Sequence, residues 1–290
     1  MTNCLIHYHH PDDDQFSLDF VNPNREKVTE RLDKYEDWVE TRVRSYDLDE
    51  EVHVVYTKKN EVTAAEAIQY KFDAAFDNMC PDTRVIIRYL LDAFDSIKEK
   101  KRDEESISLD AYKSVDVERI PDALKQVNWT GPIPEVGGQL ASNLLLCHAL
   151  PNANHRTSFS MFEGYVKATA GSTFELPSLI TDDYEWQKWV DDFIVDSKRL
   201  LTVRRNVGRF RYISKFGCTT VRRKGGIDIS LDEYDLELQT HEALSKYAIR
   251  HEQRTVTFVK KLLRRTNNGP LIEETGLTKS EFAEYIRQKI

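Results

Sequence analysis

The stretch Leu140–Arg156 reads LASNLLLCHALPNANHR and is the most informative part of the chain for predicting its fold. Its apolar run predicts a buried helix that ends at His148, and a short loop rich in Pro, Asn and Ala follows. A second helix is expected to begin near Asn154, so an ionisable ring would lie beside a helix N-terminus. The stretch therefore predicts a helix–loop–helix unit with polar residues in its loop.

The residue types in this loop favour anion chemistry. The first turn of a helix offers backbone N–H groups without carbonyl partners in the helix, and these groups attract phosphate. Arg156 adds a permanent charge with a planar guanidinium that can hold two phosphate oxygens. His148 could accept a proton from an attacking hydroxyl near neutral pH. These properties predict phosphoryl or nucleotidyl transfer, in which positioning and charge stabilisation provide most of the catalysis.

Four residues fall at the spacing of a known signature: His148, Ala153, Asn154 and Arg156. The stretch HALPNANHR resembles the Fic/Doc family, whose Fic form reads HPFxxGNGRxxR and whose Doc-like form reads roughly HxFxDANKR. The resemblance covers residues 138–170 best. A histidine at the end of an apolar helix is often only a cap or a core hydrogen bonder, but four matches at fixed spacing favour the family interpretation.

This resemblance implies a fold and a site. The fold would be mainly α, with a Fic/Doc-like helical domain that carries a small β-hairpin flap. His148 would be the general base, and Arg156 would hold the nucleotide phosphates. ATP or another nucleoside triphosphate would bind together with Mg²⁺. The residues expected to bind the nucleotide are Asn152, Ala153, Asn154, His155 and Arg156.

Three positions depart from the family pattern. Asn152 stands where the family has the acidic residue that holds magnesium, so it is a candidate metal contact, although a neutral amide is a poorer ligand for this hard cation. His155 replaces a Gly or Lys and could enter the anion site or donate to phosphate. Phe159 stands at the place of the second Fic arginine. The pattern indicates a divergent, Doc-like member rather than a standard Fic adenylyltransferase.

The expected activity is transfer of part of a nucleoside triphosphate to a Ser, Thr or Tyr hydroxyl of a target protein. Standard Fic members transfer AMP and Doc-like members transfer the terminal phosphate, and the sequence does not choose between them. The resemblance also implies a toxin-like role, restrained by an antitoxin or by an inhibitory helix. The competing interpretation is a catalytically degraded Fic fold that acts as a DNA-binding regulator or adaptor.

Glu66 is the candidate for an inhibitory glutamate. The family's inhibitory pattern has a Ser or Thr, three residues, and then Glu followed by Gly or Asn. Glu66 follows Thr63 by only three positions and precedes Ala67, so the match is imperfect. An ordinary solvent-facing glutamate in a helix is the favoured alternative.

The composition is that of an ordinary globular protein, with 40% hydrophobic and 31% charged residues in 290. No apolar run approaches the ~20 residues of a membrane span. The start, MTNCLIHYHHPDDD, lacks a secretory signal, so the sequence predicts a cytoplasmic protein without a membrane segment. Its histidines are interpreted as part of an exposed tail. The 4 cysteines are scattered without a CxxC pair, which gives a zinc or disulfide framework little support.

Charge divides the chain unevenly. Residues 196–290 contain 20 Lys and Arg against 12 Asp and Glu, a net charge of +8; since the total is −8, residues 1–195 carry −16. This asymmetry suggests parts with different partners. The expected segments are an N-terminal helical extension (1–50, with a helix over 22–46), a Fic/Doc-like domain (51–200) and a basic C-terminal module (201–290) that begins with a hairpin around Lys224-Gly225-Gly226.

The last expectations concern the tail and the flap. Residues 270–290 resemble a helix-turn-helix with Gly276 at its turn, which could bind DNA, although Glu281 and Glu284 would repel phosphates. The alternative for this tail is a structural or dimerising helical module, and a homo-oligomer stays open. The flap has two candidate positions, 106–117 and 127–136.

Overall fold

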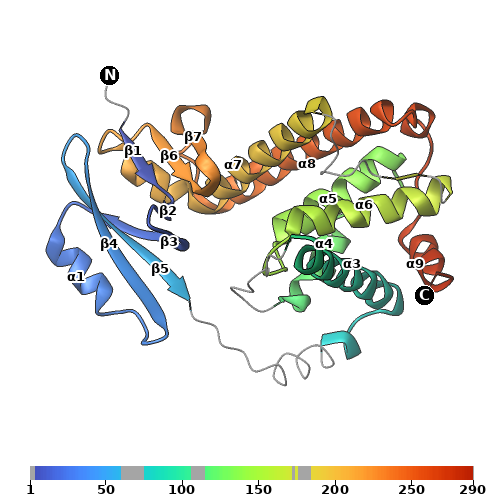
Figure 1. The fold of residues 1–290 in the computed structure, drawn as a ribbon, viewed down its shortest axis with the longest axis horizontal. Coiled ribbons are helices and arrows are strands. Elements are labelled where there is room, and N and C mark those ends of the chain that lie inside the picture. The colour runs from blue at the N-terminus through green and yellow to red at the C-terminus, as the bar shows by residue number, and fades with distance from the viewer. Residues whose placement is uncertain (1–3, 60–74, 106–114, 172–173, 176–183, 290) are drawn as a thin grey trace. The chain divides into compact units, whose positions relative to one another are not determined.

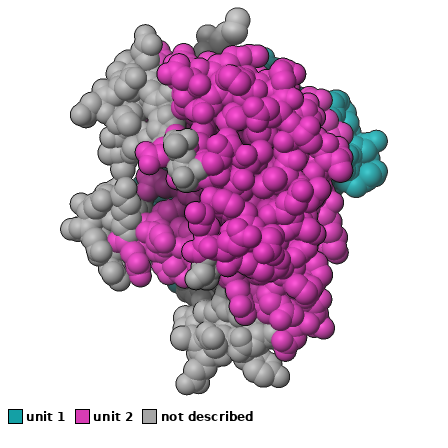
Figure 2. Space-filling view, turned by 90° about the vertical axis from the view of Figure 1, so that its right-hand side faces the viewer, with its two compact units in different colours: residues 1–61, 194–248 teal, residues 62–193, 249–290 magenta. Residues whose placement is uncertain are grey.

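The protein is mainly helical with two small sheets, as a computed structural model of the chain shows (Figure 1). The structure describes residues 4–59, 75–105, 115–171, 174–175 and 184–289. The chain forms two compact units, coloured separately in Figure 2. Unit 1 combines Met1–Glu61 with Ile194–Ala248, and unit 2 combines Val62–Phe193 with Ile249–Ile290. No described helix is both long and apolar enough to cross a membrane.

Unit 1 contains both sheets. One is an antiparallel sheet with the strand order β2-β3-β5-β4, and the other has the order β1-β6-β7, with β1 parallel to β6. Strands β6 and β7 form the predicted hairpin, with Lys224–Gly226 between them. The strands are β1 (Leu5–His7), β2 (His9–His10), β3 (Asp13–Asn22), β4 (Val39–Asp47), β5 (Glu51–Lys59), β6 (Thr220–Arg223) and β7 (Ile227–Ser230).

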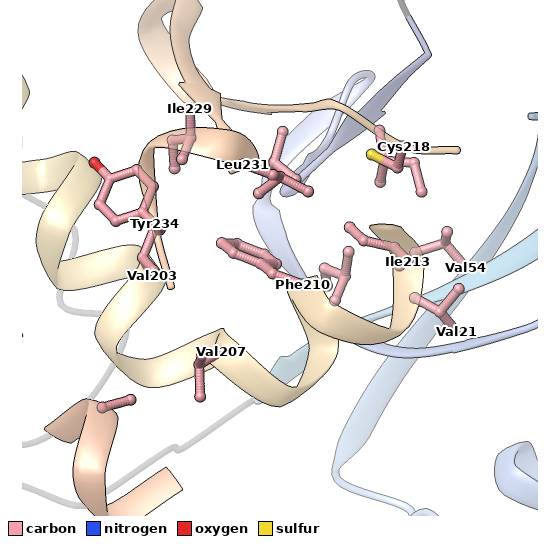
Figure 3. Packing of buried hydrophobic residues seen from close by; sticks show 14 of the residues in the cluster. Val21, Val54, Val203, Val207, Phe210, Ile213, Cys218, Ile229, Leu231 and Tyr234 are labelled. Carbon is pink, nitrogen blue, oxygen red and sulfur yellow. The ribbon is translucent and has the colours of Figure 1, made fainter. Parts of the chain in front are cut away.

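The core of unit 1 lies among the two sheets, the part of α7 (Tyr184–Ser214) from residue 194 onward, and the start of α8 (Thr240–Arg265). Strand periodicity of two and helix periodicity of 3.6 both bring apolar residues to this core. Figure 3 shows the packing around Phe210. Buried members include Val52, Val54 and Tyr56 on β5, and Leu200, Val203, Val207, Phe210 and Ile213 on α7.

The N-terminal residues are not the helical extension that the sequence predicted. Among residues 4–50, which the structure describes, only α1 (Arg25–Leu32) is an α-helix, and the Asn24 side chain accepts from the N–H groups of Glu26 and Lys27. The predicted helix over 22–46 is wrong beyond α1, because residues 39–47 form strand β4 and pair residue by residue with β5. Val39 and Val43 are spaced for a helix, but β-branched residues also suit a strand when a partner strand is present.

The N-terminal histidines are likewise not an exposed tail. His9 and His10 form β2 and are each 8% exposed. His9 Nδ1 accepts a hydrogen bond from the Lys224 N–H at 3.1 Å. Burial, together with the charges of Arg223 and Lys224, lowers the pKa of His9 to about 3.

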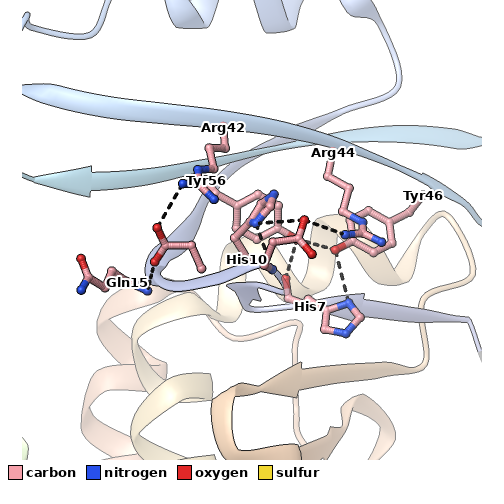
Figure 4. Close-up of polar contacts among 9 residues, drawn as sticks. His7, His10, Gln15, Arg42, Arg44, Tyr46 and Tyr56 are labelled. Carbon is pink, nitrogen blue, oxygen red and sulfur yellow. Dashed lines mark hydrogen bonds and ion pairs between the residues drawn. The ribbon is translucent and has the colours of Figure 1, made fainter.

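A polar network joins residues of the two sheets (Figure 4). The Tyr56 hydroxyl donates to His7 O at 2.8 Å and lies 2.6 Å from the Tyr46 hydroxyl. Arg42 Nη2 donates to Asp13 Oδ2 at 3.1 Å. These contacts connect β1, β3, β4 and β5, so the polar groups in them stabilise the packing of the strands.

Unit 2 is built from helices. The helices that lie in this unit, wholly or in part, are α3 (Pro81–Glu105), α4 (Ile120–Lys125), α5 (Ile133–Cys147), α6 (Asn154–Ala170), α7 up to residue 193, α8 (Thr240–Arg265) from residue 249, and α9 (Lys279–Arg287). At the centre of unit 2, α5 is almost entirely buried over residues 133–146 and contacts α4 and α6, while α3 packs against α6 and α9.

Two glycines let the neighbouring helices approach α5 closely. A Cβ at Gly137 would lie 2.7 Å from the Phe162 ring of α6, and a Cβ at Gly138 would lie 2.9 Å from Val256 Cα of α8. Both distances are shorter than real Cβ contacts, so these positions need residues without side chains. The glycines are inside α5, where they permit close packing at the start of the motif helix.

The C-terminal region differs from the predicted module. Residues 240–265 form one long helix, α8. Within 270–290, the described residues form the end of a 3-10 turn (Gly269–Ile272), an irregular segment and the single helix α9, and they do not form a helix-turn-helix. Arg287 Nη2 donates to Asp82 Oδ1 at 2.6 Å, and Phe282 is fully buried, so α9 is packed into unit 2.

The flap and the segment boundaries also differ from expectation. Residues 127–136 contain a turn, one isolated bridge between Pro132 and Thr275, and the start of α5, so this candidate is no hairpin. Most of the other candidate, residues 106–114, lies outside the described residues. The predicted 201–290 module is divided, since its residues up to 248 group with the N-terminus and the remainder groups with the motif.

Candidate functional site

His148 ends helix α5 in a left-handed backbone conformation. Its φ and ψ are 50° and 45°, and its N–H donates to Leu144 O at 3.1 Å. This conformation costs energy for a residue with a Cβ, and such residues often occur at functional sites and turns. The following Ala149 and Leu150 are buried, whereas His148 is only half-buried. The predicted helix end is therefore confirmed, with an imidazole where the chain leaves the helix.

The Asn154 side chain holds the loop in place. Its Nδ2 donates to Leu150 O at 3.0 Å and to Asn152 O at 3.3 Å, and its Oδ1 accepts from the Leu150 N–H at 3.3 Å. Asn154 is 8% exposed. Its amide group is thus used within the loop, which leaves the backbone N–H as the part of Asn154 that can face an anion.

Helix α6 begins directly after this loop, as predicted. Its N-cap is Ala153, in a left-handed conformation with φ 51° and ψ 17°, and no side chain caps the helix. Its first turn contains Asn154, His155 and Arg156 and no acidic residue. Backbone N–H groups at the start of a helix lack partners within it and carry the positive end of the helix dipole. The first turn of α6 therefore carries both the partial positive charge of the helix N-terminus and the full positive charge of Arg156.

Phe159, at the position where the Fic pattern has a second arginine, is part of the apolar packing of unit 2. The side chain is 7% exposed and packs edge-on against Phe193 and Phe258, with ring centroids 5.7 and 5.3 Å away. A charged side chain at this position would be buried among rings without a partner. The position secures α6 to α7 and α8 and is not part of a polar site.

The loop provides poor ligands for a metal ion. Residues 148–156 contain no carboxylate, and no group of three or more His, Cys, Asp or Glu in the described part of the chain could hold a metal. Asn152, the candidate contact, is half-buried and offers a neutral amide. Mg²⁺ normally binds through one or two carboxylates and substrate phosphates. These residues do not fit a magnesium ion held by the protein. Glu66, the candidate inhibitory residue, lies outside the described residues.

The structure adds polar residues that sequence reasoning missed. Ser142 Oγ lies 2.7 Å from His251 Nδ1, and both residues are at most 1% exposed, so this pair joins α5 to α8 inside unit 2. Thr157 Oγ1 and Asn143 Nδ2 are buried without a hydrogen-bond partner among the described residues. They belong to the two helices that flank the loop. Such orphaned groups are rare in folded proteins. No local pattern could reveal a contact between residues 142 and 251.

Comparison with family models identifies the chain. The model of a family of unknown function, DUF8172, matches residues 2–290. This chain belongs to DUF8172. The DUF8172 match extends through both compact units, so the family includes the sheet unit as well as the motif. Searches of the curated proteins and of the solved structures found no significant match to this chain.

Proposed function

We propose that this DUF8172 protein is a Fic/Doc-like transferase that moves part of a nucleoside triphosphate to a hydroxyl of a target protein. His148 is the general base, and Arg156 with the first-turn amides of α6 holds the phosphates. The observation that carries the proposal is the arrangement of these groups at the two ends of one short loop. A histidine at a helix C-terminus thus comes close in the chain to an uncapped helix N-terminus.

The loop geometry supports this proposal. Asn154 makes three hydrogen bonds within the loop, and Ala149 O accepts from the Asp116 N–H at 2.9 Å. A loop fixed in this way keeps donors in position before a ligand arrives, which is how preorganised sites stabilise developing charge. His148 and Ala153 hold left-handed conformations that only such surroundings maintain.

The proposed step balances as follows. His148 takes the proton from the target hydroxyl, and the oxygen forms a bond to phosphorus. If the α-phosphorus is attacked, AMP is transferred and pyrophosphate leaves; if the γ-phosphorus is attacked, phosphate is transferred and ADP leaves. Arg156 and the α6 amides stabilise the charge on the phosphate oxygens in either case. No step requires a metal ligand from the loop.

The test uses ATP labelled separately on the α and γ phosphates, incubated with the purified protein, magnesium or manganese and a cell lysate. Label transferred from α alone means adenylylation, and label from γ alone means phosphorylation. Replacing a general base lowers rates by about 100-fold or more, so His148→Ala should remove most of the transfer. If no label is transferred in a His148-dependent way by folded protein freed of partners, the transferase proposal fails.

The matched control is His241→Ala, because His241 is an exposed histidine outside the motif. This variant should transfer label as the unchanged protein does. Arg156→Ala tests the phosphate contact separately, since loss of a charge-assisted hydrogen bond should weaken ATP binding by about tenfold. Calorimetry measures that affinity without any target protein. Binding that is unchanged in Arg156→Ala would contradict the assigned role of this residue.

A further inference from the structure

The exposed face of α8 carries cations that the fold does not use. Lys261, Arg264 and Arg265 are all exposed and belong to unit 2. None of them forms an ion pair with any residue that the structure describes. Lys260 differs, because its Nζ lies 3.8 Å from Glu135 Oε1. Lys261, Arg264 and Arg265 together form the α8 cation cluster.

Two members of the cluster lie over an aromatic ring. Lys261 Nζ is 4.6 Å and Arg265 Cζ is 5.1 Å from the centre of the Trp189 ring. That ring stacks on Phe258, with ring centroids 4.6 Å apart and an interplanar angle of 18°. Phe258 is itself stacked on Phe193 at 4.1 Å. Cation–π contact restricts long flexible side chains, so the two charges are held in position at little entropic cost when a ligand binds.

The buried side of α8 shows that this face is an outer surface. Val259, Leu262 and Leu263 are at most 1% exposed, and they alternate with the cluster at helical spacing. Cations in a last helical turn complement the helix dipole. That effect does not account for Lys261, which lies a turn earlier and shares the Trp189 ring with Arg265. Positive charges that are held in position on an exposed surface favour a ligand that carries negative charge.

We propose that the α8 cation cluster binds the phosphate backbone of single-stranded nucleic acid. Three adjacent positive charges without an acidic partner among the described residues complement a row of phosphates, and they lie in the part of the sequence, residues 196–290, that carries a net charge of +8. A single strand is favoured over a duplex because its flexible backbone can bring successive phosphates to three charges that lie within about one helical turn, whereas the phosphates of a duplex are held on a rigid backbone. The proposal does not depend on transferase activity.

The proposal is tested with a fluorescein-labelled 20-nucleotide oligo-dT and fluorescence anisotropy over a series of salt concentrations. Three phosphate contacts to a single strand predict a slope of about −2 in log K against log salt. The triple variant Lys261→Gln, Arg264→Gln, Arg265→Gln should bind more than about tenfold more weakly at low salt, with a slope near zero. The control replaces Arg25, Lys27 and Lys34, three exposed cations of unit 1, by Gln in the same way.

The outcomes separate the proposal from its alternatives. Oligo-dT binding that the α8 triple variant loses and the control keeps would support it, and His148→Ala should bind as the unchanged protein does. Undetectable binding at low salt, or equal binding by both triple variants, would overturn the proposal. Tighter binding of a 20-base-pair duplex, or equal binding of polyglutamate, would also overturn it. Circular dichroism and thermal melting establish that each variant is folded.

Discussion

In unit 1 the Asp19 carboxylate is surrounded by donors, whereas in unit 2 the α8 cation cluster forms no ion pair with any residue that the structure describes. Asp19 accepts hydrogen bonds from Arg31 at 3.0 Å, from Arg209 at 2.9 Å and from the Tyr35 hydroxyl. In unit 2, Lys261 and Arg265 lie over the ring of Trp189. Charges in unit 1 connect strands and helices and stabilise them, while those of the α8 cation cluster are available to a ligand.

The backbone shows the same contrast. In the described part of the chain, the non-glycine residues with positive φ are His148, Ala153 and Asn267, and all three belong to unit 2. Two of them bound the motif loop. Residues in this conformation persist only where surrounding contacts hold them. Unit 1 thus resembles a supporting structure, and unit 2 contains the features expected of a site. The following experiments test this difference, beginning with the largest expected effect.

Acid should destabilise unit 1 first, through His9. Its pKa is about 3 in the folded chain, because the ring is buried, against an ordinary value near 6.5. As pH falls below about 6.5 the unfolded state binds a proton that the folded state does not, so stability declines until pH reaches about 3. The loss between pH 7 and pH 4 should be about 3 kcal/mol. Hydrogen exchange of unit 1 peptides measures it.

His9→Gln is the variant that isolates this effect. It retains a side-chain acceptor for the Lys224 N–H but does not titrate, so its stability should fall less over the same pH range. His241→Ala, at an exposed position, should leave the pH dependence unchanged. An identical acid transition in His9→Gln and the unchanged protein would contradict the prediction.

Added volume should be costly on the motif helix and harmless on α7. Gly138→Ala places a Cβ 2.9 Å from Val256 Cα, so α5 and α8 must separate, and we expect a loss of about 2–3 kcal/mol in chemical denaturation. Gly208→Ala is the matched control in unit 1. Its Cβ meets nothing within 4 Å, so the variant should gain about 0.5–1 kcal/mol from higher helix propensity. Equal effects of the two changes would refute the packing argument.

Removing the loop clamp should cost about 2 kcal/mol, since Asn154→Ala leaves Leu150 O and Leu150 N–H without their bonds to this side chain. The loss should be local. Hydrogen exchange should increase in residues 148–156 and stay unchanged in unit 1, and ATP binding should weaken if the loop forms the anion site. Loss that spreads evenly over both units would show that the clamp is simply part of the general fold.

The smallest effect is expected from Asp19→Asn, at about 1–2 kcal/mol near pH 7. Burial alone would raise the pKa of Asp19, but hydrogen bonds from Tyr35 and Arg31 and the Arg209 charge lower it below the usual value. This contribution is therefore present above the ordinary aspartate pKa and is lost as the carboxyl becomes protonated at lower pH. Urea denaturation at pH 7 and at pH 3 measures the difference. Equal destabilisation at both pH values would point to packing rather than charge.

Local pattern predicted the motif region well. The apolar run of α5, the polar loop and the start of α6 follow from periodicity and turn residues, and the β6–β7 hairpin follows from its glycines. The same reasoning failed at residues 33–46, where helical spacing of valines coincided with strand β4. It also failed at the C-terminus, where the apolar residues of α9 pack inside unit 2 and do not form a helix-turn-helix.

The helix–loop–helix with its histidine and arginine can be predicted without the fold, because it depends on residues close together in the chain, and the charge asymmetry follows from counting residues. Only the folded chain shows that β4 is a strand, that Ser142 meets His251, and that Lys261 and Arg265 share the ring of Trp189. Each of these contacts joins segments far apart in the chain. Strand pairing, close helix packing at glycines and cation–π contacts form only when the partner segment, distant in the sequence, is in place.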